Sequence, residues 1–493
     1  MSIDNNLSAE VDTENLASDH LEARVHRKQM RMAFRMAKEH GHELRHVRDV
    51  GWFVWRNGCW IPDPKDAPQN ALIQVKQKAM QEVARLNGEE RDKLYKDAAI
   101  LDTANNINGT ISIAKALPPI SASVEELDPD PFLVNTPDGV YDLRTSEMFP
   151  HDRKQMHTKI TGCSTFGARD DGLWHQFIEQ VLPDPDVRRF AQKILGYSML
   201  GRVQDQIFPI FFGESGTGKS TFLDSVHAAL GSYAGLAPTT LLLATGARER
   251  HPTEIAGLRG QRLVMVHETE KSQPLKTAAM KNMTGGDRLK GRFMAKDFFE
   301  FTPSHTFVLV TNYSPTLDAD DDAAWDRIRV VPFIKKFRGE KDENVNLGHQ
   351  ILESDLPSVL QWVLDGYELY EAGGLREVPQ AVVDQTREHN QKVDDLTEWI
   401  NEEVAPAPGQ RVLVSAMYEA WRQWAKPQSI PPGRKNDFTA RLERRRYRME
   451  TEDRQNWVMD VALPVTDSSE IYAGWRGGRP SQCGEQKVNE PGF

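Results

Sequence analysis

The stretch that decides the fold is Pro209-Ile210-Phe211-Phe212-Gly213-Glu214-Ser215-Gly216-Thr217-Gly218-Lys219-Ser220-Thr221-Phe222. An apolar, β-prone run leads into a glycine-rich loop, and a segment with helical spacing follows and stops at Gly231. The spacing Gly213-x4-Gly218-Lys219-Ser220 is that of a phosphate-binding loop, whose small residues let consecutive N–H groups curl around phosphate oxygens. Because proline cannot donate to a sheet ladder, the strand is predicted to begin at Pro209.

The loop predicts a site for ATP and Mg²⁺. Lys219 is expected to reach the terminal phosphates and the Ser220 hydroxyl to ligate Mg²⁺, while the N-terminus of the following helix adds positive charge. The residues expected to contact the nucleotide are consecutive: Gly213, Glu214, Ser215, Gly216, Thr217, Gly218, Lys219, Ser220 and Thr221.

Two later apolar strands end in polar residues suited to ATP hydrolysis. Residues 261–270 bring Glu268 and Glu270 to the end of a strand, where parallel sheets place their ligands. One carboxylate would help hold Mg²⁺, and a second group would polarise the attacking water; which glutamate activates the water stays open. Residues 306–312 form the other strand, and its terminal Asn312 is suited to sensing a γ-phosphate.

Arginines follow an acidic run in residues 320–330. Arg327 has two interpretations of equal weight. It either enters a neighbouring subunit's site, where such an arginine accelerates hydrolysis by about 10³–10⁵, or it forms a local salt bridge with Asp321 or Asp322.

Between the two strands lies a basic segment, residues 281–296, with five basic side chains and one acidic one. Glycines, basic residues and aromatic residues on a short hairpin suit contact with the backbone of single-stranded DNA. The candidate contacts are Lys290, Arg292 and Lys296.

The order of these motifs resembles that of the superfamily 3 helicases, particularly the phage and plasmid primase-helicase family that includes the poxvirus replication ATPases. The resemblance extends upstream through Asn135-Thr136-Pro137-Asp138-Gly139-Val140-Tyr141-Asp142-Leu143-Arg144 and covers about residues 130–337. It implies a ring-forming ATPase of the AAA+ type, expected to be a homo-hexamer, that moves 3′ to 5′ on DNA. His267 stands where several relatives have a first acid.

The resemblance also implies roles for single residues. Lys219 and Ser220 match the nucleotide-binding pair, and residues 289–296 match the pore hairpin that grips DNA. The remaining matches are Glu268 as the Mg²⁺ carboxylate, Asn312 as the sensor and Arg327 as the arginine finger.

At 493 residues the chain is too long for one core. The predicted class is α/β, with a parallel-sheet ATPase core between a mainly α+β N-terminal region and a small winged-helix-like domain. The expected order is a disordered acidic tail (1–22), an α+β module (23–117), a domain that precedes the ATPase (118–200), the ATPase core with its lid (201–375), a linker helix (376–405), the winged-helix-like domain (406–465) and a disordered tail (466–493).

Three further patterns each have a functional and a structural interpretation. The basic helix predicted from Leu21 to about His46 either touches nucleic acid or presents a solvated face. A hairpin with an Asn57-Gly58 turn is predicted next, and its tryptophans either stack on nucleic-acid bases or pack within the α+β module. Four aspartates are either catalytic or turn residues: Asp128, Asp130, Asp138 and Asp142.

Residues 434–448 hold seven basic residues and two acidic ones. They are predicted to form a duplex-binding helix, with a solvated face as the alternative. The candidate DNA contacts are Arg434, Lys435, Arg444 and Arg445.

The net charge of −11 excludes a uniformly basic nucleic-acid binder but not a local one. Three distant cysteines argue against disulfides and a zinc ribbon, and no apolar run approaches the length of a membrane span, so a cytoplasmic protein is expected. The function predicted is that of a replicative DNA helicase of a phage or mobile element, with a primase or loader in trans. The alternatives are an origin-binding or loading platform without strand separation and a phosphotransferase.

Overall fold

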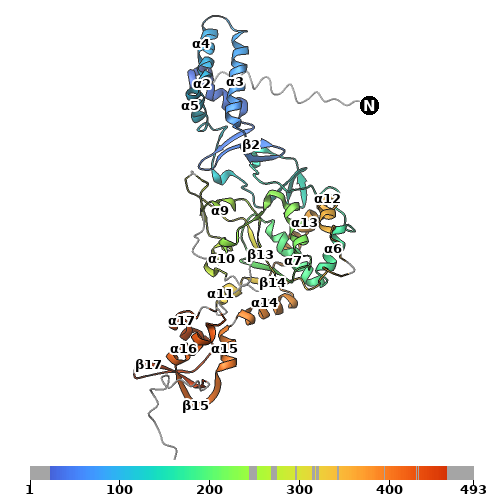
Figure 1. The fold of residues 1–493 in the computed structure, drawn as a ribbon. Coiled ribbons are helices and arrows are strands. Elements are labelled where there is room, and N and C mark those ends of the chain that lie inside the picture. Colours follow the sequence, from blue (N-terminus) through green and yellow to red (C-terminus); the bar gives the residue numbers. More distant parts are fainter. Residues whose placement is uncertain are drawn as a thin grey trace, which may run out of the picture. The chain divides into compact units, whose positions relative to one another are not determined.

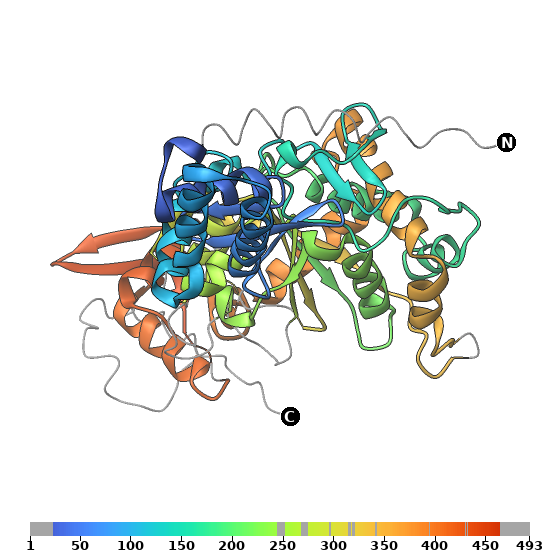
Figure 2. The ribbon, with the colours of Figure 1, turned by 90° about the horizontal axis from the view of Figure 1, so that it is seen from above.

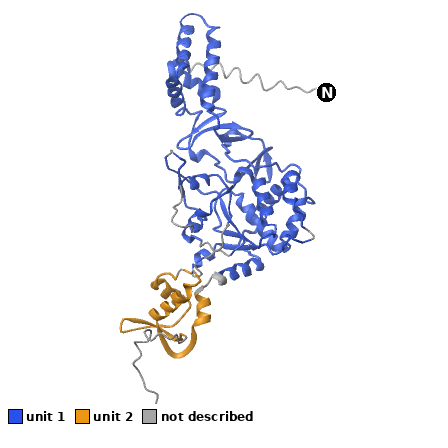
Figure 3. Ribbon diagram, in the orientation of Figure 1, with its two compact units in different colours: residues 1–391 blue, residues 392–493 orange. Residues whose placement is uncertain are grey.

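The computed structural model describes residues 23–243, 252–267, 275–294, 297–313, 317, 321–340, 343–393, 395–428, 430 and 432–463. Packing divides the chain into two units, residues 1–391 and 392–493 (Figure 3). Glu268, Glu270 and Lys296 lie outside the described residues, as do the two predicted tails. No helix in the described part of the chain is long and apolar enough to cross a bilayer.

A five-stranded parallel sheet forms the centre of the first unit, in the order β14-β8-β13-β10-β9 (Figure 1). Its strands are β8 (Phe208–Phe212), β9 (Ala234–Leu236), β10 (Leu263–His267), β13 (Thr306–Thr311) and β14 (Ile328–Pro332). The predicted parallel-sheet α/β core is therefore present. Because β13 lies between β8 and β10, the carboxyl ends of these three strands meet at one edge, next to the glycine-rich loop.

The strand before the loop begins one residue earlier than predicted, at Phe208. The Phe208 N–H donates to Arg327 O at 2.6 Å, which extends the ladder on the β14 side. On the β13 side, pairing begins only at Ile210. Pro209 is thus tolerated near the start of a strand because no ladder bond with β13 needs its missing N–H.

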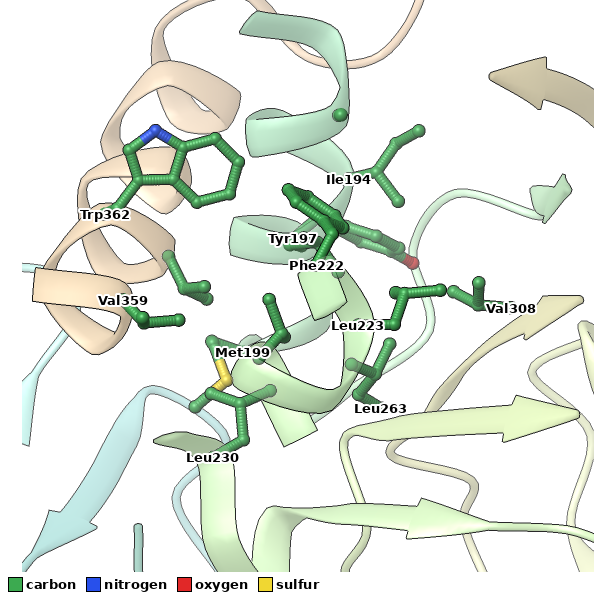
Figure 4. Packing of buried hydrophobic residues seen from close by; sticks show 14 of the residues in the cluster. Ile194, Tyr197, Met199, Phe222, Leu223, Leu230, Leu263, Val308, Val359 and Trp362 are labelled. Atoms are coloured by element: carbon green, nitrogen blue, oxygen red, sulfur yellow. The ribbon is translucent and has the colours of Figure 1, made fainter. Parts of the chain in front are cut away.

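Helices of the first unit form the main core with this sheet. They are α6 (Leu173–Val181), α7 (Pro185–Ser198), α8 (Lys219–Leu230), α12 (Leu347–Ser354) and α13 (Leu356–Gly373). Figure 4 shows Phe222 of α8 on the side of Trp362 of α13, and Leu223 on the side of Val308 of β13. Aromatic contacts fix the helix that follows the loop, since the Phe222 ring lies 5.4 Å from that of Trp174 and 6.0 Å from that of Trp362.

Smaller elements complete the region after the loop. They are α9 (Pro252–Gly257), α10 (Thr277–Met283), β11 (Leu289–Gly291), β12 (Phe299–Phe301), α11 (Asp322–Trp325) and α14 (Gln380–Val393). β11 and β12 pair antiparallel, so the basic segment does form a hairpin.

The N-terminal module joins four helices to a small sheet of order β3-β2-β1-β4. The helices lie side by side in Figure 1 and in Figure 2. They are α2 (Lys28–His40), α3 (Ala67–Val83), α4 (Gly88–Ala99) and α5 (Ala104–Ala114). The strands are β1 (Leu44–Val47), β2 (Gly51–Arg56), β3 (Cys59–Pro62) and β4 (Ser121–Ala122). The Asn57-Gly58 turn is confirmed, with both residues at positive φ. Trp60 is fully buried, so packing accounts for this tryptophan.

Arg31 and Arg35 fit neither interpretation of the basic helix, because α2 turns their side chains inward. Arg31 is 2% exposed, and its Nη1 donates to the carboxylate of the fully buried Asp97 of α4 at 3.2 Å. Its Nη2 donates to the Glu90 carboxylate at 2.6 Å. Arg35 is also buried and pairs with Glu82 of α3 at 2.7 Å. These partners lie 47 to 66 residues away along the chain, so the periodicity of the helix could not reveal them.

The motif Asn135–Arg144 spans a hairpin of β5 (Leu133–Thr136) and β6 (Gly139–Asp142), which β7 (Glu147–Phe149) extends. The buried Asn135 amide donates to Gly58 O and Lys159 O, both at 3.0 Å. Its backbone N–H donates to the Tyr233 hydroxyl beside the central sheet, also at 3.0 Å. The motif therefore fastens the N-terminal module to the ATPase-like core.

The four aspartates have structural partners. Asp128 accepts from Thr158 N at 2.6 Å and Asp138 accepts from the Ser164 hydroxyl. The other two bind one arginine: Asp130 and Asp142 lie 2.9 and 2.7 Å from Arg144 Nη2. Among the described residues, no three His, Cys, Asp or Glu side chains gather as a metal site.

The second unit has its own core. Its elements are α15 (Asp395–Glu403), β15 (Ala405–Leu413), α16 (Val414–Ala425), α17 (Lys435–Arg444), β16 (Met449–Glu452) and β17 (Gln455–Ala462). The strands form an antiparallel sheet of order β15-β17-β16. The linker helix predicted over residues 376–405 is instead two helices, and α15 buries Leu396 and Trp399 in the core of this unit.

Candidate nucleotide-binding and hydrolysis site

The glycine-rich loop connects the centre of the sheet to α8. Gly216 and Gly218 have φ of 86° and 83°, in the left-handed region that favours glycine. At Gly218 a side chain would also collide with the neighbouring helix, since a Cβ there would lie 2.6 Å from Val181 Cγ1. Helix α8 begins directly at Lys219, so its N-terminus and the exposed Ser220 hydroxyl both lie at the loop. These features fit the phosphate oxygens and Mg²⁺ predicted for the loop.

Lys219 is a buried cation held by the loop itself. The side chain is 6% exposed, and its ammonium donates to the backbone oxygens of Gly213 and Glu214, the latter at 2.8 Å. A third contact runs to Thr217 Oγ1 at 3.3 Å. No carboxylate within the described ranges pairs with this ammonium. Because burying a charge is costly unless it is compensated, an anionic ligand would suit this position.

Protonation of Lys219 should couple to nucleotide binding. Burial lowers the pKa of Lys219 to about 8, whereas a phosphate beside it would raise the pKa again because it stabilises the charged form. ATP binding should therefore weaken as pH rises through about 8, and above that pH it should take up a proton. Calorimetry in two buffers of different ionisation enthalpy measures this uptake; equal heats in both buffers at pH 8.5 would contradict it.

The predicted hydrolysis residues follow the neighbouring strands. Asn312 comes directly after β13 and is exposed, at the edge where β8 passes into the loop. Glu268 and Glu270 follow β10, the next strand across, but their own positions lie outside the described residues. Their placement and roles remain predictions.

Arg327 lies before β14 and is anchored within its own chain. Its Nη1 donates to Lys281 O at 2.8 Å and to Thr284 Oγ1 at 2.9 Å, and its Nη2 donates to Gln206 Oε1. Asp321 pairs with Lys281 rather than with Arg327, so the structure records no salt bridge from Arg327 to Asp321. A role of Arg327 in a neighbouring subunit's site stays a prediction, and it would require these bonds to be exchanged.

The hairpin displays basic and aromatic side chains outward. Lys290 and Arg292 are exposed and lie 5.4 and 4.7 Å from the ring centre of Phe298, which is itself 46% exposed. Met294 near the tip is 82% exposed. This combination of cations around an aromatic face suits a nucleic-acid backbone with stacked bases.

The four residues of the second unit that are predicted to contact DNA differ in solvent exposure. Arg434 and Lys435 are exposed at the start of α17, and Arg444 is exposed at its end. Arg445 is half-buried and donates to Thr397 Oγ1 at 3.1 Å and to Arg441 O at 3.0 Å, so part of its guanidinium serves the fold of this unit.

One segment beside the loop was missed by sequence reasoning. Residues 333–338 continue from β14 and run along the glycine-rich loop, and they bring Lys336 within 4.0 Å of Glu214 and Arg338 within 3.3 Å of Ser215. The available signal was the cluster Lys335-Lys336-Phe337-Arg338 directly after a strand of the core.

Comparisons with known proteins found two family models and several viral relatives. A family model described as "D5 N terminal like" matches residues 33–183, and a model of a family of unknown function, DUF5906, matches residues 211–327. "Putative helicase L207/L206" of Acanthamoeba polyphaga mimivirus is 24% identical over 77% of this chain and 43% of its own length. The resemblance to the phage and viral primase-helicase family is confirmed.

Another viral relative matches a shorter stretch of the chain. "Putative primase C962R" of African swine fever virus, strain Badajoz 1971 Vero-adapted, is 21% identical over 61% of this chain and 34% of its own length. The chain thus spans less than half the length of either viral relative. The solved C-terminal region of NrS-1, residues 305–718, covers 46% of this chain and 51% of its own at 12% identity and a TM-score of 0.36, a likeness too low to support an argument.

Proposed function

We propose that this chain is an ATP-driven DNA helicase of the AAA+ type that acts in replication of a phage, virus or related mobile element. The observation that carries the proposal is the buried Lys219 inside a complete phosphate loop, whose ammonium pairs with no carboxylate of the described residues. Its setting adds support, since the loop adjoins the carboxyl ends of β13 and β10, which Asn312 and Glu268 follow in the sequence. The same unit displays a basic hairpin. The helicase and primase names of the viral relatives point to the same class of activity.

In this proposal the loop N–H groups, Lys219 and the α8 N-terminus bind the phosphates. Ser220 and Glu268 would hold Mg²⁺, and Asn312 with Glu268 or Glu270 would orient the attacking water. Subunits would form a ring, proposed to be a hexamer, so that Arg327 of one subunit completes the site of the next. The direction 3′ to 5′ comes from the family resemblance alone.

Strand separation tests the proposal. The purified chain should release a labelled strand from a forked DNA duplex when ATP and Mg²⁺ are present, and a non-hydrolysable ATP analogue should give no release. Duplex binding without release under any tested condition would contradict the helicase and favour the loading platform. Appearance of the γ-phosphate on a metabolite rather than on water would instead favour a phosphotransferase.

The hairpin should couple DNA to hydrolysis. Replacing Lys290 and Arg292 with alanine should preserve ATPase activity without DNA and remove its stimulation by single-stranded DNA, because both side chains are exposed and lie far along the chain from Lys219. Loss of two phosphate contacts should also reduce the salt dependence of binding, lowering the slope of log affinity against log salt by about 1.4.

The matched control for the hairpin variant is Lys93→Ala, which removes a partly exposed lysine that pairs with Glu89 on α4 of the N-terminal module. This control should keep full stimulation. Wild-type stimulation and salt slope in the double hairpin variant would exclude the hairpin as the DNA contact.

A further inference from the structure

A short segment of the same chain lies against the outside of the phosphate loop. After β14, Phe333 N–H donates to Phe212 O at 2.7 Å, and Phe337 N–H donates to Gly216 O at 2.8 Å. We call residues 333–338 the strap. These two backbone bonds fix the strap at the beginning and at the middle of the glycine-rich loop.

Two loop glycines leave room for the strap. A Cβ on Gly213 would lie 2.3 Å from Phe333 O, and a Cβ on Gly216 would lie 2.6 Å from Arg338 Cβ. Both distances are shorter than real contacts allow, so any larger residue would push the strap away. The loop glycines therefore serve the approach of Arg338 as well as the curl of the loop.

Arg338 ends the strap with its charge at the loop. Its Nη1 donates to Ser215 Oγ at 3.3 Å, and the side chain is exposed. Within the described ranges no carboxylate forms an ion pair with Arg338. The two lysines of the strap differ, because Lys336 approaches Glu214 at 4.0 Å and Lys335 lies over the Phe337 ring at 4.8 Å.

We propose that Arg338 binds the phosphate chain of the nucleotide from the same subunit, as a second cation beside Lys219. Ser215 is the third residue of the loop whose N–H groups are proposed to bind phosphate. The Arg338 guanidinium, which contacts Ser215, therefore lies at the edge of the proposed phosphate site. The planar guanidinium can donate two parallel hydrogen bonds to phosphate oxygens, which a lysine ammonium cannot do. This inference rests on the proposed nucleotide site.

The test measures ATP affinity of the full-length chain with Mg²⁺ and without DNA. Arg338→Ala should weaken ATP binding about tenfold or more, the usual scale for hydrogen bonds to charged groups. Arg338→Gln keeps a donor for Ser215 but has no charge, so it should be weakened nearly as much. Lys335→Ala is the matched control on the same strap and should bind as the wild type does.

The outcomes separate the inference from the proposed function. If Arg338→Gln and Arg338→Ala bind ATP with wild-type affinity while Lys219→Ala binds it more weakly, the role of Arg338 is wrong and the nucleotide site stands. If the wild type itself binds no ATP, the proposed function fails and the inference fails with it. Equal weakening in Lys335→Ala would also overturn the inference, because the effect would then belong to the strap's backbone rather than to the Arg338 charge.

Discussion

Lys219→Ala is expected to abolish ATP hydrolysis and to weaken ATP binding by roughly 10- to 100-fold, the range set by losing charged hydrogen bonds of about 1.5–3 kcal/mol. The reason is the position of Lys219: it is the buried cation of the loop, and its recorded partners among the described residues are loop oxygens. Radiolabelled phosphate release and calorimetric titration measure the two effects.

The fold should survive this change. Removing the ammonium frees the backbone oxygens of Gly213 and Glu214, which lie beside an exposed loop surface, and it leaves no buried carboxylate unpaired within the described ranges. Thermal unfolding close to that of the wild type is therefore expected. A folded Lys219→Ala variant that hydrolyses ATP at the normal rate would show that the loop is not the catalytic site.

Asp97→Ala should destabilise the N-terminal module by about 3–5 kcal/mol, the usual cost of breaking a buried ion pair. Asp97 is fully buried and accepts from both Arg27 and Arg31, and Arg31 is itself 2% exposed. Without the carboxylate, Glu90 is the acidic partner that the Arg31 guanidinium keeps among the described residues, while the guanidinium stays out of water. Urea unfolding followed by circular dichroism should show an early transition of this module.

An exposed aspartate on the same module provides the comparison. Asp102 pairs with Lys76 but is 66% exposed, so Asp102→Ala should cost less than about 1 kcal/mol. Similar unfolding curves for Asp97→Ala and the wild type would mean that the arginines of α2 do not depend on internal pairing. The conclusion that the arginines of α2 stabilise the fold rather than bind DNA would then lose its main support.

Local sequence signals predicted the elements around the site. The Asn57-Gly58 turn, the apolar strand before the glycine-rich loop and the helix that ends before Gly231 all occur, the strand one residue earlier than predicted. Each depends on residues close together in sequence: left-handed turn residues, alternation of apolar side chains, or helical spacing ended by glycine. The phosphate loop belongs to this group, because its chemistry resides in eight consecutive positions.

Features that join distant segments could not be predicted in the same way. Arg31 and Asp97 stand 66 residues apart, and Arg338 and Ser215 stand 123 apart. A basic stretch has the same composition whether its charges face solvent, DNA or buried acids. The packing of α2 against α3 and α4 therefore determines which of these the arginines contact. For Arg327, the sequence suggested an acidic partner, whereas the fold supplies a carbonyl, a hydroxyl and an amide.

The most direct test of the account is the rate of ATP hydrolysis with and without single-stranded DNA, measured on the same preparation. The proposed helicase predicts a clear basal rate that rises on addition of DNA, and the rise should vanish in the Lys290→Ala, Arg292→Ala variant. No phosphate release, or a rate that is the same at every DNA concentration, would contradict a DNA-dependent ATPase.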